Sequence, residues 1–146
     1  MALTGLSVFD KTVHETNGWI ASLADRLGID HALAFKALRA TLHALRDQLP
    51  PDTAAHLGDQ LPMLLRGAYY EGWHPSVTPA RLRHKEALLR RIGTELPADI
   101  DLALDAVVEA VFGVIWEKVE PGEVAKLARM TPEELRDLWP RVARDD

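Results

Sequence analysis

The second half of the sequence repeats the pattern of the first half, and this internal repeat constrains the fold more than any other feature. Under the shift that carries Pro51 onto Pro121, apolar residues and two prolines of the first half meet their like in the second half. Two prolines rarely match by chance in one ungapped register. We therefore predict a tandem duplication, with copies at residues 8–74 and 78–142. The matched pairs include Leu38–Val108, Leu42–Phe112, Leu45–Ile115, Leu49–Val119, Pro51–Pro121 and Pro62–Pro132.

Two copies are too few for an open solenoid, which usually needs about three repeats to bury a continuous core. Before the matched run, the shift that aligns the two copies is slightly smaller. A single inserted residue near Ile100 explains this difference. We expect the two copies to bury their apolar faces against each other about an approximate two-fold axis. Residues 1–146 are then expected to form a single helical domain.

Apolar residues in the first copy recur every three or four positions, from Phe9 through Val13 to Leu27, which is the period of an α-helix. Proline, glycine and aspartate at the ends of these periodic runs suit the starts and stops of helices. The expected elements are a helix that begins at Ser7 and ends at Gly28, a second that ends at Pro50 and Pro51, a third capped by Asp52 that runs through Leu57, and a fourth from Pro62 to about Tyr70.

The second copy contains the longest helix predicted, over residues 101–118. It is apolar almost all round, which favours a central, buried element. A buried strand is the opposing interpretation, but the segment is too long for one and carries an acidic residue at every fourth position. Further helices are expected to begin at Thr78–Pro79, at Gly122 and at a capping box of Thr131 with Glu134. The sequence therefore predicts an all-α fold with about four helices in each copy.

Composition excludes several classes of protein. Hydrophobic residues make up 47% of the 146 residues and charged residues 27%, which is typical of a folded domain. The chain has no cysteine, so disulfides, thiol nucleophiles and cysteine-ligated metals are excluded. The longest apolar run, residues 110–116, is much shorter than the ~20 residues of a membrane helix. With no secretion signal at the start, we expect a cytoplasmic protein without a membrane partner.

Several segments of the chain resemble one known family. Residues 42–50 read LHALRDQLP, residues 56–67 read HLGDQLPMLLRG, and residues 69–73 read YYEGW. The opening residues 8–13 and the closing residues 138–140 fit the same family. In these segments the chain is similar to the bacterial proteins grouped as domain of unknown function family 2267. The resemblance implies an all-helical bacterial protein, and it implies no activity and no catalytic residue.

The aromatic segment within this resemblance is the first candidate site. Arg66, Tyr69, Tyr70, Glu71 and Trp73 combine aromatic rings with charge, which is the composition of interaction hot spots. The alternative is a structural joint between the two copies, in which Tyr69 packs as Trp139 does and Arg66 and Glu71 make structural contacts. Both interpretations are open at this point.

A pair of histidines offers a second candidate site. His43 and Asp47 lie four residues apart, as do Asp52 and His56, so a helical hairpin could bring the histidines together as a metal site or general base. The alternative is that each histidine bonds a helix end or a carboxylate. The familiar zinc spacing of two histidines four residues apart is absent. The second copy has Gly113 and Lys126 at the matching positions.

A basic stretch raises the question of nucleic-acid binding. Its cations are Arg81, Arg83, His84, Lys85, Arg90 and Arg91. On a helix they scatter around the axis, whereas a groove-binding helix gathers them on one face. Acidic residues follow at once, and the net charge of the chain is −5. A nucleic-acid partner is therefore not expected, although it is kept as a further alternative.

The sequence contains no nucleophile elbow, phosphate-binding loop or dinucleotide fingerprint, so it predicts no catalytic residue and no cofactor. We expect a non-catalytic, helical protein-interaction module that binds a protein partner or a second copy of itself. Its surface would include Arg66, Tyr69, Tyr70, Glu71 and Trp73. The alternatives are a small-ligand or metal-binding protein using His43 and His56, and nucleic-acid binding through the stretch from Arg81 to Arg91.

Overall fold

The computed structural model describes residues 4–80 and 84–144, and these ranges contain helices and no β-strand. The all-α prediction is confirmed. The elements in chain order are α1 (Ser7–Leu27), α2 (His31–Gln48), α3 (Pro51–Asp59), α4 (Met63–Tyr70), the 3-10 helix η1 (Pro75–Val77), α5 (Lys85–Thr94), α6 (Leu104–Lys118), α7 (Pro121–Met130), the 3-10 helix η2 (Glu133–Leu138) and α8 (Arg141–Arg144).

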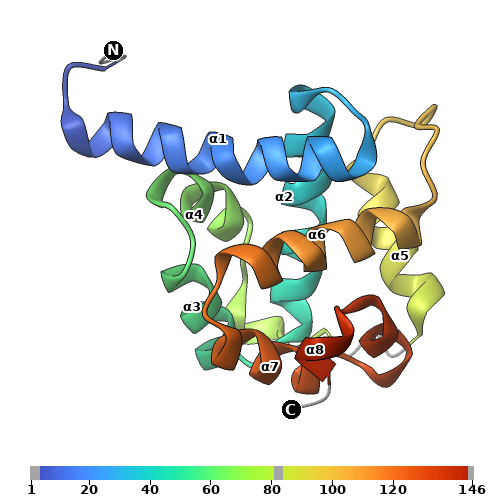
Figure 1. Cartoon of the computed structure of the whole chain (residues 1–146). Coiled ribbons are helices and arrows are strands. Elements are labelled where there is room, and N and C mark those ends of the chain that lie inside the picture. Colours follow the sequence, from blue (N-terminus) through green and yellow to red (C-terminus); the bar gives the residue numbers. More distant parts are fainter. Residues whose placement is uncertain (1–3, 81–83, 145–146) are drawn as a thin grey trace.

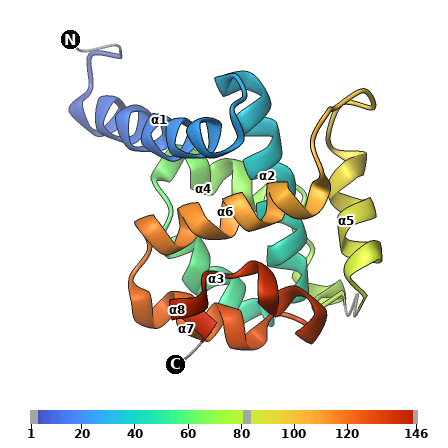
Figure 2. The same ribbon diagram turned by 45° about the vertical axis from the view of Figure 1, so that its right-hand side comes forward.

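Two helices occupy the centre, and the others surround them. Helix α1 lies across both α2 and α6, which also contact each other (Figure 1). The N-terminal half of α1 covers α4, while α5 packs against α2 and α6 on another side (Figure 2). Helices α7 and α8 lie together at the opposite end from α1 (Figures 1 and 2). This arrangement separates an α1–α4 end from an α7–α8 end.

The core is continuous through both halves of the chain. Helix α6 buries every residue from Val111 to Ile115, as a helix that is apolar nearly all round should. Phe112 stacks on Trp139 with the ring centroids 3.8 Å apart. Buried apolar residues of α2 and α6 belong to the same cluster as those of α1 and α7. None of the described helices is both long and apolar enough to cross a membrane.

Several helix boundaries agree with the sequence. Helix α1 begins at Ser7 and ends before Gly28, which adopts the left-handed conformation (φ 66°) that a C-terminal glycine permits. Helix α4 ends at Tyr70, as expected. Helix α3 starts at Pro51 with Pro50 as its N-cap, two residues before the predicted cap at Asp52. Asp52 is therefore not its N-cap, because the rigid backbone of the preceding proline already sets the start of the helix.

The predicted helix at Thr78–Pro79 is wrong. Thr78 is extended (φ −111°, ψ 153°), and its N–H and hydroxyl both donate to the carbonyl of Pro75, closing η1. The next N–H, that of Ala80, donates to the carbonyl of Asp47 at 2.6 Å. These contacts hold the chain extended, and the helix begins at Lys85. Arg81 and Arg83 lie outside the described residues.

Other predicted helix starts in the second half are also wrong. Helix α6 begins at Leu104, not at residue 101. Gly122 lies inside the first turn of α7, whose N-cap is Glu120. Thr131 ends α7, and its hydroxyl donates to the carbonyl of Leu127 instead of capping a following helix. Its supposed partner in the capping box, Glu134, instead accepts the N–H of Lys85 at 2.7 Å.

Candidate functional site

The N-terminal half of α1 is fixed to the start of α4 by one side chain. The first N–H groups of a helix have no partner within that helix, and Pro62, the N-cap of α4, offers no side-chain acceptor. Thr12 on α1 supplies it, because its hydroxyl oxygen accepts the N–H of Leu64 at 2.8 Å. The two helices are therefore held in register although they are far apart in the sequence.

Exposed apolar side chains gather where these two helices meet. Leu6, Val8 and Phe9, at the start of α1, are 53%, 56% and 45% exposed. Met63 and Leu64, at the start of α4, are 43% and 52% exposed. Single exposed apolar residues are ordinary, whereas several on two helices that contact each other are candidates for a binding surface. We call these five residues the α1–α4 patch.

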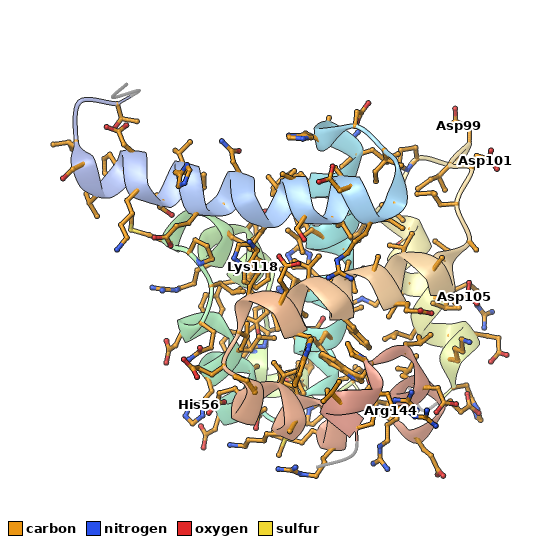
Figure 3. All side chains as sticks on the ribbon, in the orientation of Figure 1. His56, Asp99, Asp101, Asp105, Lys118 and Arg144 are labelled. Atoms are coloured by element: carbon orange, nitrogen blue, oxygen red, sulfur yellow. The ribbon has the colours of Figure 1, made fainter. Side chains whose placement is uncertain are left out.

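A hollow of about 640 Å³ lies on one side of the α1–α4 contact. Val8 and Met63 of the patch both line it, so the two helices contribute to one surface. Figure 3 shows Lys118 of α6 beneath α1, at the edge of this hollow. The rest of its lining carries charges of both signs, so the hollow favours neither an anionic nor a cationic ligand. The charged residues are Lys11, Glu15, Asp59, Arg66 and Lys118.

A groove of about 480 Å³ lies on the other side of the contact, between α1, α2 and α4. Two of its lining residues, Thr16 and Arg39, each hold a buried polar atom without a hydrogen-bond partner among the described residues, the hydroxyl of Thr16 and Nε of Arg39. Because both atoms are inaccessible to solvent, they do not offer a contact to a ligand in the groove. Its apolar residues are Ile20, Phe35, Leu64, Gly67 and Ala68.

The structure gives Arg66 and Tyr69 internal contacts. Arg66 donates from Nε to the carbonyl of Gly58 at 2.9 Å and from Nη2 to that of Leu61 at 3.0 Å, so it caps the end of α3. Tyr69 is fully buried, and its hydroxyl donates to the carbonyl of Ala54 at 2.6 Å. Burial raises the pKa of Tyr69 far above its usual value. Its inclusion in an interaction surface is wrong, because no partner can reach its ring.

The rest of the predicted segment is more accessible. The ring of Tyr70 packs against that of Trp73, with the centroids 5.3 Å apart, and both residues are half-buried. Glu71 is exposed, and its carboxylate lies 3.8 Å from Nη1 of Arg39 at the edge of the groove. A role for Tyr70, Glu71 and Trp73 in binding a partner stays a prediction.

The two histidines of the predicted metal site have different surroundings. His43 is buried, and its ring nitrogens lie 3.1 Å from Oε1 of Glu95 and 2.7 Å from the carbonyl oxygen of Ala68. Its ring links α2 to the ends of α4 and α5. His56 is exposed at the outer surface of α3 (Figure 3). Within residues 4–80 and 84–144, no three His, Cys, Asp or Glu side chains are grouped closely enough to hold a metal ion.

Asp47, the third residue of that predicted site, is an ion-pair anchor. Its carboxylate lies 2.7 Å from Nε of Arg46 and 2.6 Å from Nη2 of Arg91. Burial alone would raise the pKa of Asp47, but the hydrogen bonds and charges of Arg46 and Arg91 outweigh it and lower the pKa. The carboxylate therefore ties α2 to α5 and is engaged by two cations.

Carboxylates accompany much of the basic stretch. Besides Arg91, Nδ1 of His84 lies 3.4 Å from Oε1 of Glu134. Arg90 is exposed. Figure 3 shows three acidic side chains beyond α5, on the connection to α6 and at the start of α6. They are Asp99, Asp101 and Asp105. In the described residues, this stretch is a helix interspersed with negative charge.

The α1–α4 patch was not predicted from the sequence, although a signal for it was present. Leu6, Val8 and Phe9 are three large apolar residues within four positions. A single helix face cannot bury all three, because neighbouring positions point about 100° apart. An apolar excess at one helix end therefore indicated exposed apolar surface, but not which other helix would border it.

One comparison with known proteins identifies a relationship. The model of a family described as uncharacterized conserved protein, DUF2267, matches residues 16–138, which is most of the chain. The match begins within α1 and covers every helix from α2 to α7. No curated protein matches the chain significantly.

Proposed function

This chain belongs to the DUF2267 family of uncharacterized conserved proteins, and we propose that it is a non-catalytic, helical protein-interaction module that self-associates. The observation that carries the proposal is the α1–α4 patch. Five large apolar side chains remain exposed at one end of the molecule, on two helices that a hydrogen bond holds together. Covering such a group is favourable by about 25 cal/mol for each Å² of apolar surface removed from water.

The shape of this end favours a second copy as the partner. The start of α1 presents a convex apolar edge with Leu6 and Phe9, and the groove beside α4 presents an apolar hollow. A surface that contains both an edge and a hollow is self-complementary. Two copies related by a two-fold axis can each insert the start of α1 into the groove of the other, which closes the assembly as a dimer.

The groove is suited to a helix end. Ile20, Phe35 and Leu64 are among the apolar residues that line it. An amphipathic helix in an apolar groove is a common mode of recognition.

Sedimentation equilibrium of the full chain across the micromolar range tests the proposal. We expect a dimer that dissociates on dilution. The double variant Phe9→Asp with Leu64→Asp should be monomeric at the same concentrations, because it places two charges in the contact. Both residues are about half exposed, so helical circular dichroism should be unchanged.

The matched control is Val142→Asp on α8, which adds the same charge at an apolar side chain that is 62% exposed at the other end of the molecule. It should dimerise as the unmodified chain does. A strictly monomeric unmodified chain would overturn self-association. A dimer that Val142→Asp disrupts and the double variant does not would place the interface elsewhere.

A further inference from the structure

Both ring nitrogens of His43, on α2, meet an oxygen of another helix. Nε2 lies 2.7 Å from the carbonyl oxygen of Ala68 in the last turn of α4, and Nδ1 lies 3.1 Å from Oε1 of Glu95, the C-cap of α5. Helix α2 contacts both of these helices and lies between them in Figure 2. The side chain of His43 is only 9% exposed, so the ring joins three helices where water has little access.

The chemistry of the two oxygens decides which ring nitrogens carry a proton. A backbone carbonyl only accepts hydrogen bonds, so Nε2 of His43 donates its N–H to Ala68. A neutral imidazole has one N–H, which leaves a lone pair on Nδ1. An ionised carboxylate also only accepts, so this lone pair and an ionised Glu95 would face each other with no hydrogen between them. The separation of 3.1 Å is a hydrogen-bond distance if one proton lies between the two atoms.

The end of α4 favours a positive charge on this ring. The last carbonyls of a helix carry the negative end of its dipole, which nearby cations stabilise. Helix α2 already places one cation there, because Arg46 donates from Nη1 to the carbonyls of Tyr69 at 2.7 Å and of Glu71 at 3.0 Å. A protonated ring at His43 would be a second cation at the same helix end.

The charged groups on the neighbouring turns of α2, α4 and α5 are paired with one another. They are Arg39, Arg46, Asp47, Glu71 and Arg91. Helices α1 and α6 also pack against α2, but within the described residues no ion pair joins His43 to either of them. The carboxyl group of Glu95 is therefore the group that decides whether the pair holds a second proton.

From this geometry we infer that His43 and Glu95 share one proton in the folded protein at neutral pH, and that loss of this proton releases the end of α5 from α2. We call this contact the His43–Glu95 clasp. Without the proton, the carboxylate of Glu95, which is partly exposed, turns to water. The ring keeps its bond to Ala68 in both states, and Arg91 still holds α5 one turn earlier through Asp47. The clasp does not involve the α1–α4 patch, so it is independent of self-association.

The clasp makes folding take up a proton above about pH 6.5, where an unfolded histidine is mostly neutral. Its contribution to stability is fully present below that pH, because the folded and unfolded chains then hold the same number of protons. Above it, the folded chain holds one proton more, so stability falls as the pH rises. For one proton, the folding equilibrium constant decreases by up to about tenfold for each pH unit.

Urea denaturation of the full chain between about pH 6.5 and 8.5 tests the clasp, with Glu95→Gln as the decisive variant. Glutamine has the size of glutamate, and its amide N–H can donate to the lone pair of Nδ1, so no shared proton is needed. We expect the folding equilibrium constant of the unmodified chain to decrease across this range. In Glu95→Gln, the part of the decrease that is due to the shared proton should be absent.

The matched control is His84→Gln. Nδ1 of His84 also lies near a carboxylate, 3.4 Å from Oε1 of Glu134, but the histidine side chain is 78% exposed, so water can replace the partner. This variant should show the same pH dependence as the unmodified chain. NMR of the unmodified chain should show the ring nitrogens of His43 changing together with the backbone N–H of Glu95 as the pH is raised, while that of Arg91 changes little.

Two results would overturn the proposal. One is an equal decrease in the folding equilibrium constant for the unmodified chain and Glu95→Gln, because no bound proton would then depend on that carboxyl group. The other comes from NMR of the unmodified chain at neutral pH, if Nδ1 of His43 carries no proton while the carboxyl carbon of Glu95 has the shift of an ionised group. A proton found on either of the two groups supports the clasp.

Discussion

The segments α2–α3–α4 and α6–α7–η2 have similar backbone angles at matched helix ends but differ in what covers them. Leu49 and Val119 end their helices with almost equal backbone angles (φ −95°, ψ 148° and φ −105°, ψ 153°). Pro62 and Pro132 precede the next helix with φ −57°, ψ 148° and φ −51°, ψ 144°. Both pairs belong to the matched register of the internal repeat. The agreement supports the predicted duplication, which itself stays a prediction.

Matched arginines bond the carbonyls at the end of the second helix of each segment. Arg66 donates to the carbonyl of Leu61, and Arg136 donates to the carbonyl of Thr131, which is the matching residue. A guanidinium satisfies helix-end carbonyls that have no partner within the helix. The same physical problem is therefore solved in the same way in both segments.

The aromatic anchors that follow are matched in position but not in chemistry. Tyr69 donates its hydroxyl to the carbonyl of Ala54, whereas Trp139 donates Nε1 to the hydroxyl of Thr131 at 3.0 Å. Each ring is buried and its one polar group is satisfied nearby. The turn geometry and the position of the buried ring are therefore shared, while the outer residues, such as Tyr70 and Pro140, differ.

The largest effect should come from the core of the second segment. Phe112→Ala is expected to lower the free energy of unfolding by about 3–5 kcal/mol, because it removes a buried ring and its stack on Trp139. Leu42→Ala, at the matching position, should cost about 2–5 kcal/mol and less than Phe112→Ala. Urea denaturation measures both. A loss under about 1 kcal/mol at Phe112 would mean that α6 is not the central buried helix.

A smaller effect is expected where matched carboxylates tie the helices together. Asp47 pairs with Arg91 of α5, and Glu117, its match in the second segment, lies 3.3 Å from Arg26 of α1. Asp47→Asn should cost about 2 kcal/mol near neutral pH, because it weakens bonds to two arginines. Glu117→Gln should cost less, since that side chain is 44% exposed.

The dependence on pH follows from the lowered pKa of Asp47. A carboxyl with a lower pKa in the folded state stabilises the fold above its unfolded pKa, about 3.9, and loses that contribution as the pH falls through its folded pKa. The unmodified chain and Asp47→Asn should therefore differ in stability near neutral pH and converge below about pH 4. Urea denaturation across that range measures this. A difference that persists undiminished in acid would contradict the ion-pair explanation.

The arginine caps provide a direct test of equivalence. Arg66→Met and Arg136→Met should each lower the free energy of unfolding by about 1 kcal/mol, because each removes two hydrogen bonds to carbonyls at a helix end. The loss should be larger at Arg66, whose acceptors are partly buried, whereas the bond from Arg136 to Arg129 is exposed. Thermal unfolding compares them. If one variant is as stable as the unmodified chain, the two arginines do not have the same role.

The smallest effect is expected where the segments diverge. Ala128→Gly should cost about 1 kcal/mol, the usual helix penalty of glycine. The reverse change at the matching position, Gly58→Ala, should gain less than that, because its Cβ displaces the ring of Tyr70. NMR of the Tyr70 ring should show the displacement. A full gain of about 1 kcal/mol with an unmoved ring would show that the first segment has room for a side chain there.

Much of the fold was predicted from local patterns, and two of the wrong predictions have the same cause. The period of α1 and the prolines before α3 and α4 act on neighbouring residues, so those elements were predicted to within a residue or two. The capping box at Thr131 failed because the same hydroxyl instead bonds Leu127 and accepts Trp139. The helix start predicted at Thr78 was wrong for a similar reason, since the bonds of Thr78 to Pro75 keep the chain extended. The sequence indicates that a capping residue will make a polar contact, but it does not indicate which group will be the partner.

The candidate sites were less predictable than the fold. The segment from Arg66 to Trp73 was identified from its composition, but whether Tyr69 faced a partner or the core depended on α3, which supplies the carbonyl of Ala54. The α1–α4 patch depended on which face of α1 the rest of the chain covers.

The helices and the apolar faces that must be buried follow from the order of the amino acids, because both depend on residues a few positions apart. Which side chains remain in contact with water was set by the packing of the helices, because burial depends on elements that the chain brings together from distant positions. Leu64 and Tyr69 belong to the same short helix, yet one is half exposed and the other fully buried.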